Sequence, residues 1–132
     1  MSEEKIPGDR SYTKSHEWVL VEGRRVTVGI TDHAQSQLTD IVFVDLPSVG
    51  KKVAAHASVL VLESVKTVAD VYAPADGSIV EVNTELKTHP ELINQDPYGK
   101  GWIYRLDASS APDAASLLTA DQYRALVSSG AH

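Results

Sequence analysis

One lysine has the surroundings of a group that is chemically modified. Lys66 lies in the segment Glu-Ser-Val-Lys-Thr (residues 63–67), between two runs rich in β-branched residues at 59–62 and 68–72. A tight reversal between such runs usually carries Asn-Gly, Asp-Gly or Gly-x, and none is present. Local rules tend to be broken at functional positions. The residues alone leave two interpretations open: a hairpin with Lys66 at its tip, or one long strand with an exposed lysine.

Other catalytic and metal-binding patterns are missing from the sequence. The chain has no cysteine, which excludes thiol nucleophiles, disulfides and thiolate ligands. Its five histidines are dispersed, and no pair has the i, i+4 spacing of a zinc-binding helix. Neither a Gly-x-Ser-x-Gly elbow nor a phosphate-binding Gly-x-x-x-x-Gly-Lys loop occurs. We therefore expect no metal site, and an enzyme is the least supported class of protein.

The charge of the chain limits its partners. A formal net charge of -6 argues against binding to nucleic acid or to an anionic membrane, because both require clustered Lys and Arg. No run of 18 apolar residues could span a bilayer. The acidic N-terminus lacks the apolar segment of a secretory signal and the Arg-rich composition of a transit peptide. We expect a cytoplasmic, monomeric protein.

The elements that must position Lys66 are mostly short strands. A chain of 132 residues with 42% hydrophobic residues and few aromatics predicts one compact domain with an aliphatic core. Period-two patterns and β-branched runs between turn residues predict a mainly β fold. The run at 41–44 is continuously apolar, which predicts a strand buried on both faces. The strands are expected at residues 17–21, 26–30, 41–44, 59–62, 68–72, 78–82 and 102–106.

Helices are predicted at a few positions only. Thr31 can cap a short helix that runs to Leu38, and a helical turn is expected near residues 84–94. The spacing Thr119-x-x-Gln122 is that of a capping box. We expect a loose leader over residues 1–11, then a single domain over 12–132 that includes a C-terminal helical segment at 112–129.

Six blocks of sequence, in order, resemble one known family. Residues 63–74 around Lys66 resemble the lipoylation site of the glycine cleavage system H protein family. Small departures are Thr39, where that family often has Gly, and Thr67, where Ala is common. The further blocks of the resemblance, which spans roughly residues 12–106, are 15–18, 29–35, 40–47, 77–83 and 92–102.

The resemblance implies a fold and a function. The fold is a flattened β-barrel or barrel-sandwich hybrid, the lipoyl-domain hammerhead, with two antiparallel sheets, short helices and a C-terminal helix. Lys66 would carry lipoic acid in amide linkage, attached by a lipoate ligase or a lipoyl/octanoyl transferase. The implied protein is a non-catalytic carrier of glycine catabolism. It takes an aminomethyl group from the pyridoxal-phosphate glycine decarboxylase to the folate-dependent aminomethyltransferase, and dihydrolipoamide dehydrogenase then reoxidises it.

Three carboxylates are candidates for supporting roles. The aminomethyl cargo is cationic and hydrolytically fragile, so a water-excluding cleft that offers a carboxylate would protect it. Glu17 and Asp70 are the candidates for that cleft, and each could instead be an ordinary strand carboxylate. Glu63 could help an enzyme recognise the hairpin, or it could be a solvated turn charge.

Two further carrier functions would also use a hairpin lysine. A relay of lipoyl groups to other dehydrogenase complexes cannot be separated from the glycine cleavage role by sequence. A biotinyl carrier is disfavoured, because Val65 and Thr67 flank the lysine where biotin acceptors usually have Met.

Overall fold

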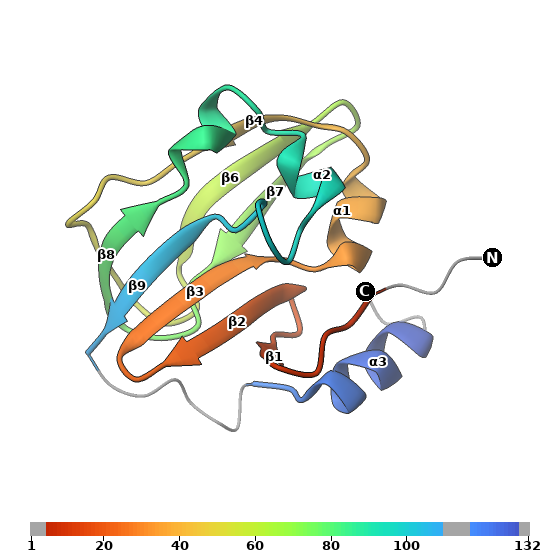
Figure 1. Ribbon diagram of the computed structural model, residues 1–132, viewed down its shortest axis with the longest axis horizontal. Coiled ribbons are helices and arrows are strands. Elements are labelled where there is room, and N and C mark those ends of the chain that lie inside the picture. Colours follow the sequence, from red (N-terminus) through yellow and green to blue (C-terminus); the bar gives the residue numbers. More distant parts are fainter. Residues whose placement is uncertain (1–4, 110–116, 130–132) are drawn as a thin grey trace.

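Two antiparallel sheets form the body of the protein. The computed structural model describes residues 5–109 and 117–129 (Figure 1). The larger sheet has the strand order β1-β2-β3-β9-β8-β5, and the smaller sheet has the order β4-β6-β7. In the described residues no strand pair joins the two sheets, so the arrangement is a sandwich and not a closed barrel. The mainly β fold with two antiparallel sheets is confirmed. The strands are β1 (Ser11–Tyr12), β2 (Glu17–Glu22), β3 (Arg25–Ile30), β4 (Ile41–Asp45), β5 (Lys52–Val53), β6 (Ser58–Ser64), β7 (Val68–Tyr72), β8 (Gly77–Val82) and β9 (Tyr104–Ala108).

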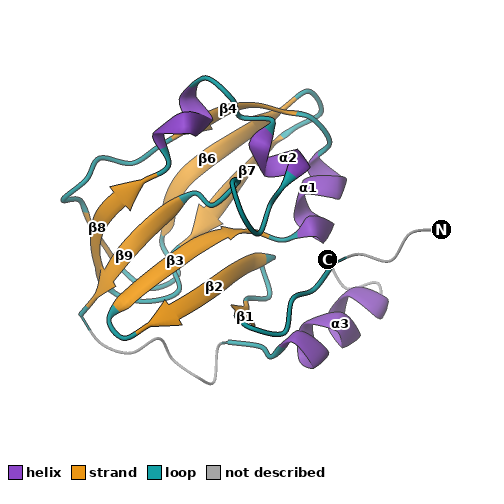
Figure 2. Cartoon of the chain, viewed as in Figure 1, coloured by secondary structure: helices purple, strands orange, loops and turns teal. Residues whose placement is uncertain are grey.

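The helices are short and lie at the margins of the sheets (Figure 2). They are α1 (Asp32–Leu38), the 3-10 helix η1 (Thr84–Lys87), α2 (Leu92–Gln95) and α3 (Ala120–Ser128). The predicted Thr31 cap is present, since its hydroxyl accepts from Ala34 N at 3.1 Å. None of the helices in the described part of the chain has the length and apolar character needed to cross a bilayer.

An aliphatic core fills the space between the sheets. Leu62, Val71, Ile79 and Leu106 are almost completely buried there, and full burial of such a side chain contributes roughly 1.5–3 kcal/mol. This core of Val, Ile, Leu and Ala is the one that the scarcity of aromatic residues predicts.

A separate aromatic cluster lies around Trp18 and supports the β2–β3 hairpin. Trp18 packs in this cluster with Tyr12 and Tyr123. Gly29 pairs with Trp18 across the strands, and a Cβ on Gly29 would come within 2.6 Å of the indole ring. The turn of the hairpin contains Gly23 at φ 67°, a conformation that glycine adopts without steric cost.

The prediction of a strand buried on both faces at 41–44 is wrong. Ile41 and Val44 are buried, but Val42 and Phe43 are 52% and 51% exposed. The three-stranded sheet has only one face against the core, and an irregularity between Ile41 and Phe43 turns both apolar side chains outward. The predicted start of the closing strand is also too early, because β9 begins at Tyr104 and not at Trp102.

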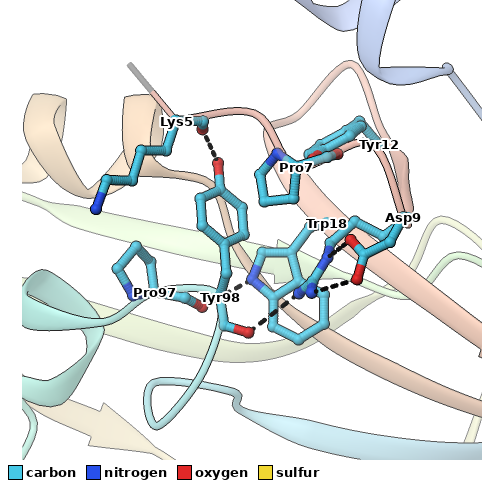
Figure 3. Close-up of polar contacts among 8 residues, drawn as sticks. Lys5, Pro7, Asp9, Tyr12, Trp18, Pro97 and Tyr98 are labelled. Atoms are coloured by element: carbon cyan, nitrogen blue, oxygen red, sulfur yellow. Dashed lines mark hydrogen bonds and ion pairs between the residues drawn. The ribbon is translucent and has the colours of Figure 1, made fainter. Parts of the chain in front are cut away.

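The N-terminal segment is not loose from residue 5 onward. Tyr98 donates its hydroxyl hydrogen to the Lys5 carbonyl at 2.5 Å, and the Trp18 indole N–H donates to the Pro97 carbonyl at 2.8 Å (Figure 3). The Arg10 guanidinium lies 4.7 Å from the centre of the Trp18 ring. Lys5 and Arg10 thus hold the segment against Tyr98, in the loop that precedes β9, and against Trp18 of β2.

The C-terminal segment is helical over a shorter range than predicted. Thr119 and Gln122 form the predicted capping box, and α3 follows it. Leu118 instead forms a β-bridge with Tyr12, so the prediction of helix at this residue is wrong. Residues 112–116 of the predicted helical segment lie outside the described residues.

A lysine at a hairpin tip beside two cavities

Lys66 lies at the tip of the β6–β7 hairpin. Strand β6 ends at Ser64 and β7 begins at Val68, so the chain reverses within residues 65–67. Lys66 is exposed. Of the two interpretations of this segment, the hairpin is correct and the single long strand is wrong.

A serine side chain makes the reversal possible without glycine. Ser64 Oγ accepts from the backbone N–H groups of Lys66 at 3.1 Å and Thr67 at 3.0 Å. Ser64 N also donates to the Thr67 carbonyl at 2.8 Å. No residue of the loop has a positive φ. Serine caps of this kind replace the backbone turn that Asn-Gly would form. Ser64 is therefore the local sequence signal for this turn, and a search for glycine-containing turns overlooks it.

The tip is tied to a strained turn at Thr39. Val65 N donates to the Asp40 carbonyl at 3.0 Å, and Asn94 Nδ2 donates to the Thr39 carbonyl at 2.8 Å. Thr39 has φ 65° and ψ -151°, a region populated almost only by glycine. The departure from Gly at this position therefore falls on the turn that anchors the tip of the hairpin.

Glu63 lies on the outer face of the small sheet, close to Lys66. It is exposed and pairs with Phe43 on one side and Val68 on the other. These two apolar neighbours are 51% and 61% exposed. The carboxylate thus lies in an exposed row of side chains that any protein reaching Lys66 would approach.

Glu17 is buried and fixed by three neighbours. It is 1% exposed. Its Oε1 accepts from the hydroxyls of Thr13 and Ser15, the latter at 2.7 Å, and its Oε2 accepts from Tyr72 N at 3.0 Å. Burial raises the pKa of the Glu17 carboxyl above its ordinary value, and these hydrogen bonds oppose part of that rise. Glu17 is therefore not a surface carboxylate.

Two cavities lie along β7: one at its last residue, Tyr72, and the other at its middle residues 69–71. The first has a volume of about 340 Å3 and is lined by Glu17, His56 and Tyr72. The second, of about 230 Å3, is lined by Asp70, His33 and Leu38 among others; we call it the Asp70 cavity. Ser15 lines both.

The structure does not bring the two candidate cleft carboxylates into one cavity. Asp70 is exposed and accepts from Ser58 Oγ at 2.7 Å, whereas Glu17 lines only the first cavity. The sequence patterns also missed His16 and His33, whose rings lie 4.9 Å apart beside the Asp70 cavity. They are distant in sequence, so no spacing pattern could reveal the pair. No group of three or more metal-ligating side chains occurs in the part of the chain that the structure describes.

A β sandwich that presents a lysine on an exposed hairpin tip has the architecture of a carrier domain for a swinging cofactor. Comparison with known proteins specifies which carrier. Residues 10–130 match the family model of the glycine cleavage H-protein, and the chain belongs to that family. The family is a lipoyl-carrier component of the glycine cleavage system and not a catalyst.

Individual relatives agree with this assignment. The chain is 55% identical over 126 residues to the glycine cleavage system H protein of a Thermus thermophilus strain, covering 96% of this chain and 98% of the relative. It is 52% identical to that of Symbiobacterium thermophilum, covering 95% and 98%. A crystal structure of the H protein from Mycobacterium marinum has 46% identity and a TM-score of 0.83, covering 95% of this chain and 99% of that one.

Proposed function

We propose that Lys66 is the lipoyl attachment site and that the chain carries the aminomethyl group between the enzymes of glycine cleavage. The observation that supports this most strongly is the exposed lysine on a hairpin tip fixed by Ser64 and Asp40. Lysine provides an amine that an acyl-transferring enzyme can acylate. The dithiolane of the bound lipoyl group supplies the sulfur chemistry, which a chain without cysteine lacks.

The length of the arm matches the position of the Asp70 cavity. An extended lysine stem with a lipoyl chain spans roughly 14 Å at ordinary bond lengths. Asp70 lies four residues beyond Lys66, so at the rise of a strand the two Cα atoms are at most roughly 13 Å apart. An arm folded back along β7 would place its end at the mouth of this cavity, whose walls include Leu38 and Leu62.

The charges near that position suit a cationic cargo. Glu17 is a buried carboxylate, and no ion pair compensates it within the described residues. Asp70 contributes a second carboxylate at the neighbouring cavity, across the shared Ser15. A cation beside such carboxylates is stabilised most where water is excluded. We infer that Asp70 faces the aminomethyl nitrogen and that Glu17 adds negative charge from behind Ser15.

Neutral replacements test these two carboxylates. Asp70→Asn and Glu17→Gln should each speed the loss of methylamine from the loaded protein, because the cation loses a nearby negative charge. Asp45→Asn is the matched control, since Asp45 is an exposed carboxylate of the same sheet as Asp70 and lines neither cavity. Unchanged loss in both test variants, or equal acceleration in the control, would refute the role.

Glu63 is proposed to contact the enzyme that acylates Lys66. Its support is the exposed position three residues before the lysine, between Phe43 and Val68. A charge at the rim of an interface mainly affects the association rate. In Glu63→Gln the kcat/KM of acylation by lipoate ligase should therefore fall severalfold, whereas an exposed carboxylate far from the tip, changed in Glu22→Gln, should leave it unaltered.

The partner enzymes that follow from this proposal are those of the complete cycle. They are the pyridoxal-phosphate glycine decarboxylase, the folate-dependent aminomethyltransferase, dihydrolipoamide dehydrogenase, and a lipoate ligase or lipoyl/octanoyl transferase. The single domain over 12–132, the monomeric state and the cytoplasmic location stay predictions.

Reconstitution with the purified enzymes tests the carrier function. Carbon dioxide release from carboxyl-labelled glycine should require the lipoylated chain and should be absent with Lys66→Arg. Equal turnover with the Lys66→Arg variant would contradict the proposal.

A further inference from the structure

One side chain of the C-terminal helix contacts two residues that form or support the wall of the Asp70 cavity. Tyr123 of α3 is fully buried, and its ring stacks on Tyr12 with centroids 4.8 Å apart. Its hydroxyl lies 2.7 Å from His16 Nδ1 and 2.7 Å from Thr31 Oγ1. A hydroxyl can serve both neighbours, because it donates one hydrogen and accepts through its lone pairs.

Of the two neighbours of this hydroxyl, one lines the cavity and the other caps a helix that forms part of its wall. His16 lines the cavity itself. Thr31 caps α1, and that helix contributes His33, Ala34 and Leu38 to the same wall. One phenol oxygen therefore joins the loop before β2 to the first turn of α1.

The loop at His16 needs such a support. His16 has φ 71°, an unfavourable conformation for a residue with a side chain. Strained residues of this kind persist only where their surroundings fix them. Here the His16 carbonyl accepts from Thr31 N at 3.1 Å, and the Tyr123 hydroxyl holds the ring.

We propose that Tyr123 is a positioning residue that fixes the wall of the Asp70 cavity and thereby slows loss of the aminomethyl cargo. The inference rests on the proposed function, because it requires the loaded arm to occupy this cavity. The C-terminal helix is then a functional part of the carrier. Tyr123 acts through His16 and Thr31 and does not itself line the cavity.

Tyr123→Phe tests the role of the hydroxyl, because phenylalanine keeps the ring that stacks on Tyr12. Tyr12→Phe is the matched control: its hydroxyl donates to the Pro7 carbonyl, and Tyr12 does not line the cavity. We expect methylamine loss from loaded Tyr123→Phe to be at least about fivefold faster than from the wild type, because the hydrogen bonds of the hydroxyl to His16 and Thr31 are both lost. Tyr12→Phe should match the wild type.

Two further measurements separate positioning from general stability. The 15N chemical shift of His16 Nδ1 should change in Tyr123→Phe and stay constant in Tyr12→Phe. Thr31→Ser keeps the hydroxyl and should retain the slow loss. Equal acceleration in both tyrosine variants, or acceleration that follows the free energy of unfolding, would overturn the proposal, as would unchanged loss in Tyr123→Phe.

The proposed function and this inference can fail separately. Loaded wild-type protein that loses methylamine as fast in the native state as in denaturant has no protective cavity, and that result overturns both. Slow loss from the native wild type that is unaffected by Tyr123→Phe overturns the inference alone.

Discussion

The Lys66 tip and the Glu17 site differ in solvent exposure and in how each side chain is held. Lys66 is exposed and its position is set through the backbone, by Ser64 and Asp40. Glu17 is 1% exposed, and its two carboxylate oxygens accept hydrogen bonds from Ser15 and from the Tyr72 backbone N–H. One site leaves its side chain free to move on a fixed backbone, and the other fixes the side chain itself.

A carrier with these two sites can combine a mobile arm with protection of its cargo. An attachment residue must be accessible to an acylating enzyme and then leave the arm free to swing. In the proposed function Glu17 adds negative charge near the cargo, and a charge that hydrogen bonds hold in place needs no reorganisation when a cation arrives. Substitution of Glu17 should therefore lower the free energy of unfolding, whereas substitution of Lys66 should abolish acylation and leave the free energy of unfolding nearly unchanged.

The largest expected effect on stability comes from alanine at Glu17. Glu17→Ala leaves the hydroxyls of Thr13 and Ser15 and the Tyr72 N–H without their acceptor, so the free energy of unfolding should fall by about 2 kcal/mol. Lys66→Ala should change it by less than about 0.5 kcal/mol, because Lys66 is exposed. Denaturant unfolding of both variants measures the difference. Equal losses would show that the two regions do not differ as described.

A smaller gain is expected at the turn that anchors the tip. Thr39→Gly removes the strain of φ 65° and should raise the free energy of unfolding by about 1 kcal/mol. Thr88→Gly is the matched control, because Thr88 also ends a helix, and its hydroxyl, like that of Thr39, donates to a nearby carbonyl, but its φ is -106°. It should lose stability, since glycine adds only unfolded-state freedom there. A loss at both positions would remove the argument for strain.

The smallest effect is a pH dependence that originates at Glu17. Burial raises the pKa of this carboxyl above 4.5, so the folded state binds a proton more tightly than the unfolded state. The free energy of unfolding of the wild type, relative to Glu17→Gln, should therefore increase as the pH falls from 7 through the raised pKa toward 4.5. Below 4.5 the difference should be constant. Parallel pH profiles for the two proteins would contradict the raised pKa.

Local sequence signals predicted several of the helix starts and strands. Thr31 and the Thr119–Gln122 pair carry cap chemistry, and both caps form where predicted. Residues 17–30 carry two β-rich runs around a Gly-containing turn, and they form the β2–β3 hairpin. The prediction for Lys66 depended on the resemblance of its segment to a known family, since the residues alone left hairpin and strand equally open.

The remaining features depend on contacts between distant residues. The outward position of Phe43 follows from which face of β4 meets the core, and a short apolar run does not contain that information. The packing of the N-terminal segment depends on Tyr98, and the His16–Tyr123 contact joins residues 107 apart in the sequence. The family resemblance makes Glu17 a candidate, but its burial and its three hydrogen bonds depend on where Thr13, Ser15 and Tyr72 lie in the fold.

Peptide-resolved mass spectrometry can establish whether Lys66 is the lipoyl attachment site. After expression with lipoate and a lipoate ligase, every lysine of the chain is assayed for the mass of one lipoyl group. We expect the modification on Lys66 alone and an unmodified chain for Lys66→Arg. A lipoyl group on any other lysine, or a modified Lys66→Arg variant, would contradict it.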